Sequence, residues 1–141
     1  MQPRVPPPRP WWVIPVALLA AAFGVATIVS GGRVLFGPDA ARTAAGHYVP
    51  FVVWFNFLAG FAYLGAAAGI ALGRRWAGPL SLGIALATGL TFAALGAHVL
   101  AGGAYESRTV GAMTLRLGVW ATIAVQVRRR PDLDGPGARQ A

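Results

Sequence analysis

The sequence predicts an all-α membrane protein, a bundle of four transmembrane helices with both termini in the cytoplasm. Three observations lead to this prediction. The chain of 141 residues is 56% hydrophobic and 11% charged, with a mean hydropathy of +0.59, which is too apolar for a soluble surface. It contains four apolar segments of about 20 residues, the length of a helix that crosses the hydrocarbon core. Its arginines concentrate in the segments that one side of such a bundle would carry.

The apolar segments define the expected helices in order. The first helix covers about residues 11–30, the second 49–72, the third 80–101 and the fourth 110–127. The stretches between them contain the glycine, proline and polar residues that end helices and form turns. Because each apolar run is continuous and does not alternate with polar residues, the pattern argues against a transmembrane β-barrel.

Two polar tails flank this transmembrane domain of residues 11–127. Residues 1–10 are rich in proline and predict an extended chain, and residues 128–141 form an arginine-rich tail. We expect both tails in the cytoplasm. We do not interpret the first apolar segment as a cleaved signal peptide, because it begins with Trp11 and Trp12, typical of a membrane interface, and "IVSGGR" is a poor cleavage site.

The arginines decide the orientation. All twelve basic residues are arginines, and the formal net charge is +8. With both termini inside, Arg33, Arg42 and Arg108 lie outside, Arg116 lies within the membrane, and the other eight are cytoplasmic. These eight are Arg4, Arg9, Arg74, Arg75, Arg128, Arg129, Arg130 and Arg139. Because they are divided between two tails and one short loop, they indicate membrane topology and contact with anionic lipid, not nucleic-acid binding. We expect a multi-pass protein of the bacterial inner membrane.

The few polar residues of the predicted bundle gather at its outer side. They are His47, Tyr48, Asn56, His98, Glu106 and Arg116. Arg116 lies ~10 Å into the fourth helix, the same depth as Asn56 in the second. An arginine at this depth costs ~2.5–3.5 kcal/mol unless it reaches the interface or finds a partner. We therefore expect either a structural ion pair with Glu106 or a site for an anion or a proton.

The sequence gives little support for a metal site or for catalysis. It has no cysteine, and its two histidines, His47 and His98, are candidate ligands that lie in different segments without metal-binding spacing. No cofactor is required, although contact with haem, a pigment or a quinone stays open. Because the chain has no nucleophile elbow, phosphate-binding loop or paired carboxylates, we expect that it is not an enzyme.

Small residues predict how the second helix packs. Gly65, Gly69 and Gly73 repeat at four-residue spacing, which lets another helix approach closely. Asn56 and Tyr63 share one face of this helix with small residues, so we expect both polar side chains to point inward.

These observations favour a small integral inner-membrane subunit or accessory protein. It would self-associate or pack beside larger membrane proteins of a bacterial complex, respiratory or photosynthetic. One alternative is a protein that binds or transports a small ligand, a quinone or an ion at an outer-leaflet site around Arg116, Glu106, His98 and Asn56. Another is a haem- or metal-binding redox component.

Overall fold

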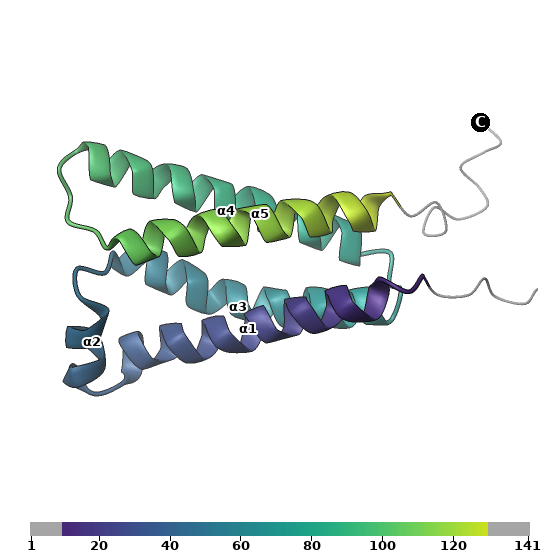
Figure 1. The fold of residues 1–141 in the computed structure, drawn as a ribbon, viewed down its shortest axis with the longest axis horizontal. Coiled ribbons are helices and arrows are strands. Elements are labelled where there is room, and N and C mark those ends of the chain that lie inside the picture. Colours follow the sequence, from purple (N-terminus) through teal and green to yellow (C-terminus); the bar gives the residue numbers. More distant parts are fainter. Residues whose placement is uncertain (1–9, 130–141) are drawn as a thin grey trace, which may run out of the picture.

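The computed structural model describes residues 10–129, and this part of the chain is all-helical (Figure 1). Four helices are long: α1 (Val13–Phe36), α3 (Pro50–Ala71), α4 (Ala77–Leu100) and α5 (Ser107–Arg128). Each is long and apolar enough to cross a membrane. The prediction of an all-α protein with four potential membrane spans is confirmed. The predicted tails lie outside the described residues, apart from Pro10, Arg128 and Arg129.

The long helices run up and down, so that residues 10 and 129 lie at one end of the bundle (Figure 1). We call this end the terminal end; it also carries the turn between α3 and α4. The opposite end, which we call the α2 end, carries the turn between α4 and α5 and a short helix, α2 (Asp39–Ala45). The expected loop arginines Arg33, Arg42 and Arg108 belong to the α2 end.

The helix boundaries differ from the prediction mainly around α2. The first helix continues past Gly31 and Gly32 to Phe36, and it ends at Gly37, directly before Pro38. Proline disfavours helical backbone at the residue before it, so the helix stops there and not at the two glycines. The short α2 was not predicted, although its alanine-rich sequence and an aspartate in the first turn favour a helix. The last two long helices begin three residues earlier than expected.

Helix α1 packs most closely against α3. Its buried residues are spaced alternately by four and three, the seam of a coiled coil. They are Val13, Ala17, Ala20, Gly24, Thr27 and Gly31. Most of them are small, which allows the backbones of the two helices to approach each other closely. A Cβ atom on Gly24 would lie 3.0 Å from the carbonyl oxygen of Gly60 in α3.

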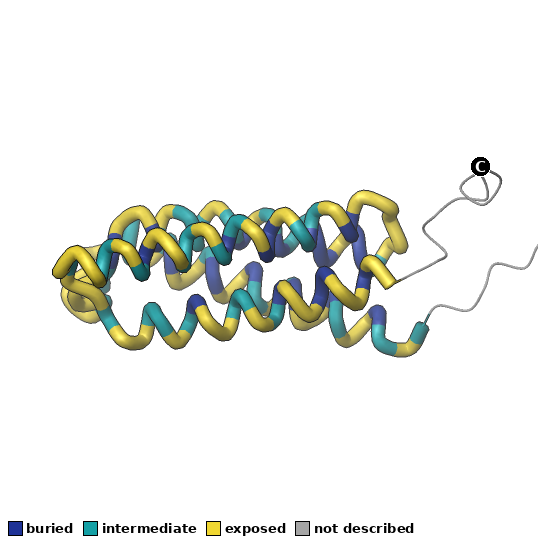
Figure 2. Tube along the Cα trace, turned by 90° about the horizontal axis from the view of Figure 1, so that it is seen from above, coloured by how far each residue is buried: buried dark blue, intermediate teal, exposed yellow. Residues whose placement is uncertain are grey.

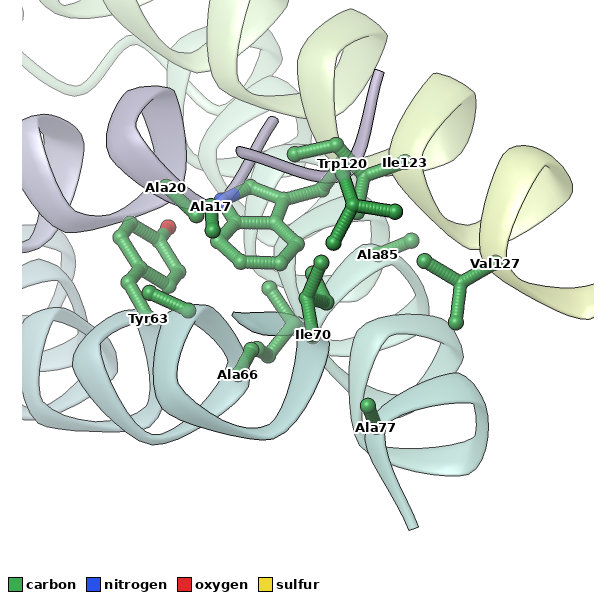
Figure 3. Packing of buried hydrophobic residues seen from close by; sticks show 13 residues of the cluster. Ala17, Ala20, Tyr63, Ala66, Ile70, Ala77, Ala85, Trp120, Ile123 and Val127 are labelled. Atoms are coloured by element: carbon green, nitrogen blue, oxygen red, sulfur yellow. The ribbon is translucent and has the colours of Figure 1, made fainter. Parts of the chain in front are cut away.

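The centre of the bundle is a stacked aromatic pair, Tyr63 of α3 and Trp120 of α5 (Figure 3). The ring centroids are 4.7 Å apart, with an angle of 36° between the planes, and neither side chain is exposed. The inward orientation predicted for Tyr63 is confirmed. Buried positions are dense here and toward the terminal end, whereas the α2 end is more exposed (Figure 2). A smaller buried cluster, which includes Leu95 and Met113, packs near the α2 end.

Gly73 ends α3. Its φ is +64°, and its N–H donates to the carbonyl of Ile70, while the N–H of Arg74 donates to the carbonyl of Gly69 at 2.8 Å. These two bonds form a Schellman motif, which requires a left-handed residue and therefore favours glycine. Gly73 thus lies beyond the helix and does not extend its packing stripe, contrary to the expectation.

The other two glycines of the expected stripe face the start of α4. A Cβ atom on Gly69 would lie 2.7 Å from the Trp76 ring and 3.1 Å from the Cβ atom of Ala77. One on Gly65 would meet only the end of the Leu80 side chain, at 3.8 Å. Gly69 is therefore the glycine of this set at which close packing leaves no room for a side chain.

Candidate functional site

A cavity opens at the α2 end, between α1, α2, α3 and α5. Its volume is about 250 Å³. Its walls combine apolar and polar side chains, with contributions from all four helices. The polar side chains around it include Ser30, Tyr48, Asn56, Glu106, Arg108 and Arg116. The structure therefore brings together four of the six polar residues singled out in the sequence, and it adds Ser30 and Arg108.

Arg116 lies half-buried in the wall of this cavity. Its Nη2 donates to the hydroxyl oxygen of Thr27 in α1 at 3.5 Å, a long contact, and its Nε is buried without a hydrogen-bond partner. Among residues 10–129 the structure forms a single ion pair, Arg42 with Asp39 at 3.2 Å. The expected ion pair between Arg116 and Glu106 is not formed. The Arg116 charge is therefore uncompensated by any carboxylate of the described chain.

Glu106 instead holds the loop that precedes α3. Its Oε1 accepts the backbone N–H of His47 at 2.9 Å. Two residues later, the Nη2 of Arg108 donates to the carbonyl of Ala44, the penultimate residue of α2, at 3.2 Å. We call these two bonds the loop contacts. They join the start of α5 to the end of α2, so they fix the rim of the cavity.

Gly46 makes the first loop contact sterically possible. Its φ of +68° is in the region that favours glycine. In addition, the Glu106 carboxylate occupies the space that a Cβ atom on this residue would need. The backbone between α2 and α3 thus turns sharply beneath the carboxylate and presents the N–H of His47 to it.

Asn56 lines the same cavity from α3. Its side-chain oxygen is buried and has no hydrogen-bond partner. An unsatisfied buried amide oxygen costs about 1–3 kcal/mol, so a hydrogen-bond donor in the cavity would relieve this cost, whereas the Arg116 Nε needs an acceptor. Tyr48, just before α3, contributes to the wall on the loop side.

The two histidines do not belong to the cavity. The ring Nε2 of His98 lies 3.2 Å from the carbonyl oxygen of Ala104 in the turn between α4 and α5, and its ring packs edge-on against Phe51. His47 contributes its backbone N–H, not its ring, to the loop contacts. Within the described part of the chain, no three His, Asp or Glu side chains cluster in a way that could bind a metal ion.

A second polar layer lies deeper, toward the middle of the bundle. The Tyr63 hydroxyl lies near the Thr88 hydroxyl of α4. However, the hydroxyls of Tyr63 and Thr88 and the indole N–H of Trp120 are buried without a hydrogen bond of normal geometry. Thr27, Thr88 and Ser30 do not stand out in the sequence, because single hydroxyl residues are common in apolar helices. The spacing of small residues by four and three in this segment is a signal in the sequence that predicts a buried position for Thr27.

No protein-family model matches the chain, and neither the curated proteins nor the solved structures include a match to it.

Proposed function

We propose that this chain is a non-enzymatic, multi-pass protein of the bacterial inner membrane that binds an anionic group in the cavity at its α2 end. The observation that carries the proposal is the state of Arg116: half-buried, with an unbonded Nε and no acidic partner among residues 10–129. A buried charge without a partner is costly. An anion in the cavity would supply the counter-charge.

The charges around the cavity favour an anion. Arg108 and Arg116 contribute two positive charges, and Glu106 contributes one negative charge. Glu106 and Arg108 each make a hydrogen bond to the backbone, so they fix the loop, and their opposite charges leave Arg116 as the excess positive charge of the cavity. The planar guanidinium of Arg116 matches the paired oxygens of a carboxylate or a phosphate. The Asn56 amide adds neutral hydrogen-bonding capacity at the same wall.

The same observations weigh against the other ligands considered. A quinone head is neutral, so it could bond to Asn56 or Tyr48 but would leave the Arg116 charge uncompensated. The two histidines considered as haem or metal ligands do not line the cavity: the His98 ring contacts the Ala104 carbonyl, and His47 contributes its backbone N–H to the loop contacts. We therefore favour an anion over a quinone, haem or metal.

The arginine distribution supports an outer-leaflet position for this site. Arg74, Arg75, Arg128 and Arg129 belong to the terminal end, which we assign to the cytoplasm. The α2 end then faces the periplasm. Arg116 is nine residues after Ser107, the first residue of α5, so it lies ~14 Å along this helix from the outer end.

Thermal unfolding in mild detergent tests the proposal. Short-chain dihexanoyl phosphatidylglycerol and inorganic phosphate are added as anionic probes, with dihexanoyl phosphatidylcholine as the neutral comparison. We expect at least one anionic probe to raise the melting temperature of the wild type and of Arg42→Gln, a matched control whose arginine is already ion-paired. Arg116→Gln should lose the response. An equal response of both variants would contradict the proposal.

The accessory-subunit hypothesis is a second proposal, and one observation favours it. On α4, Ala93 and Ala97 are exposed at four-residue spacing, and a Cβ atom on the adjacent Gly96 would meet nothing within 4 Å. Such a face allows a helix of another subunit to approach closely. A partner subunit should then co-purify with the wild-type protein from mildly solubilised membranes. Ala97→Leu should release this partner. If the partner still co-purifies with Ala97→Leu, this face is not the interface.

A further inference from the structure

Two buried polar atoms at the cavity wall have no hydrogen bond, and they need opposite partners. The Nε of Arg116 carries a hydrogen that requires an acceptor, whereas the side-chain oxygen of Asn56 requires a donor. Both residues line the same cavity, and the two atoms are not bonded to each other. A carboxylate or a phosphodiester offers only acceptors, so it would satisfy Arg116 and leave the Asn56 oxygen unpaired. The cavity therefore complements a ligand that has both an anionic group and a hydrogen-bond donor.

The stacked rings of Tyr63 and Trp120 give a common reference level for α3 and α5, which run in the same direction (Figures 1 and 3). Asn56 is seven residues before Tyr63, and Arg116 is four residues before Trp120. At 1.5 Å per residue, their backbones lie ~10 and ~6 Å from this level toward the α2 end, a difference of less than one helical turn. One small ligand in the cavity can therefore contact both side chains.

The charges around the cavity favour a neutral donor. Glu106 balances one of the two arginines that line it, which leaves one positive charge in excess. A ligand with one negative charge compensates this excess, but an ammonium donor on the same ligand would cancel the compensation. A hydroxyl donates to the Asn56 oxygen without adding charge. The cavity also has room for it, because its volume of about 250 Å³ equals that of about eight waters at ~30 Å³ each.

We infer that the ligand is a hydroxyl-bearing phosphate ester, with its phosphate at Arg116 and a hydroxyl at Asn56. This inference rests on the proposed anion site and names the chemistry of its ligand. The non-ester oxygens of the phosphate match the guanidinium and supply the acceptor that the Arg116 Nε lacks. The ester-linked polyol carries the hydroxyl to Asn56 on α3. The phosphoglycerol headgroup of an anionic lipid has this chemistry, and so has soluble glycerol 3-phosphate.

Ligands that differ in their hydroxyls test the inference on the wild-type chain. Dihexanoyl phosphatidylglycerol and dihexanoyl phosphatidylmethanol both carry one negative charge, but the headgroup of the second has no hydroxyl. Glycerol 3-phosphate and methyl phosphate form the corresponding soluble pair. Isothermal titration calorimetry in nonionic detergent measures the four affinities. We expect the hydroxyl-bearing member of at least one pair to bind about three- to tenfold more tightly, the contribution of one hydrogen bond.

Two variants of the cavity wall locate the hydroxyl. Asn56→Leu removes the acceptor with little change in side-chain size, so the preference for the hydroxyl should disappear while the hydroxyl-free ligand still binds. Tyr48→Phe is the matched control, because it deletes a different polar group from the same wall and leaves Asn56 in place. It should keep the preference. Arg116→Gln should abolish the binding of all four ligands.

The outcomes separate this inference from the proposed function. If both members of each pair bind equally through Arg116, the anion site stands and the hydroxyl contact is wrong. If Asn56→Leu keeps the preference, or if Tyr48→Phe alone loses it, the hydroxyl does not bind at Asn56 and the inference is wrong. A preference confined to the lipid pair identifies a lipid headgroup, and one confined to the soluble pair identifies a soluble ester; both support the inference. If no anion binds, both proposals fail.

Discussion

Gly24 of α1 and Gly60 of α3 face each other so closely that a Cβ atom on either would lie 3.0 Å from the carbonyl oxygen of the other. A Cβ atom on Gly60 would also lie 2.6 Å from the Cγ1 atom of Ile28. Side-chain atoms of Ile28 could move, but the facing backbone could not move without separating the helices. The closest helix pair of the bundle therefore depends on two residues without side chains.

Gly60→Ala should destabilise the protein by about 1–3 kcal/mol, because the added methyl group overpacks the contact between α1 and α3. The matched control is Gly83→Ala in α4, where a Cβ atom would meet nothing within 4 Å. That change should be neutral or slightly stabilising, since alanine favours helix over glycine. Thermal unfolding in one detergent compares the two variants. Equal melting temperatures would show that the close contact contributes nothing to stability.

The loop contact of Glu106 predicts a difference between two substitutions. In Glu106→Gln the side-chain oxygen can still accept the N–H of His47, so the loop should keep its conformation. In Glu106→Ala this acceptor is lost, and the amide of His47 should exchange with deuterium about tenfold faster. Hydrogen exchange followed by mass spectrometry of the peptide around residues 44–48 measures this. Identical exchange in both variants would show that the Glu106 side chain does not hold the loop at the rim of the cavity.

Tyr63 predicts another contrast, between its ring and its hydroxyl. Because the hydroxyl is buried without a hydrogen bond, Tyr63→Phe should leave the free energy of unfolding unchanged or raise it by up to about 1 kcal/mol. Tyr63→Ala removes the ring stacked on Trp120 and should cost about 3–5 kcal/mol. Thermal unfolding measures both. A clear loss in Tyr63→Phe would mean that the hydroxyl has a partner in the membrane-embedded protein.

The assignment of the α2 end to the periplasm predicts which residues a membrane-impermeant thiol reagent can reach. The chain has no cysteine, so the reagent can label only the single cysteine introduced in each variant. Ala44→Cys in α2 should be labelled in intact spheroplasts, and Arg75→Cys in the turn at the terminal end should be labelled only after lysis. A reporter that is active only in the periplasm, fused after Ala141, should be silent. The reverse pattern would place the cavity on the cytoplasmic side.

The sequence predicted the long helices well because apolar length is a strong signal in a membrane protein. The bounds of α3, Pro50–Ala71, differ by one residue at each end from the expected 49–72. The end of α1 was missed because Gly31 and Gly32 resemble helix breakers, whereas membrane helices tolerate glycine. Gly31 in fact packs against the Cβ atom of Phe57 in α3.

The candidate site was predicted in part. Helical rise predicted that Arg116 and Asn56 lie at one level, and both line the cavity. The partner of Glu106 could not be inferred, because it is the backbone N–H of His47, and residue types do not reveal which backbone groups a turn leaves unpaired. His98 was grouped with these residues by depth alone, but it faces a different turn.

The central claim is that an anionic ligand compensates the charge of Arg116. The most direct measurement is the identity and amount of lipid that co-purifies with the protein from bacterial membranes, determined by mass spectrometry after extraction. We predict about one anionic lipid per wild-type molecule and per Arg42→Gln molecule, and close to none for Arg116→Gln. A thermal unfolding transition shows whether the Arg116→Gln variant is folded. If the folded variant retains the same anionic lipid in the same amount, the claim is contradicted.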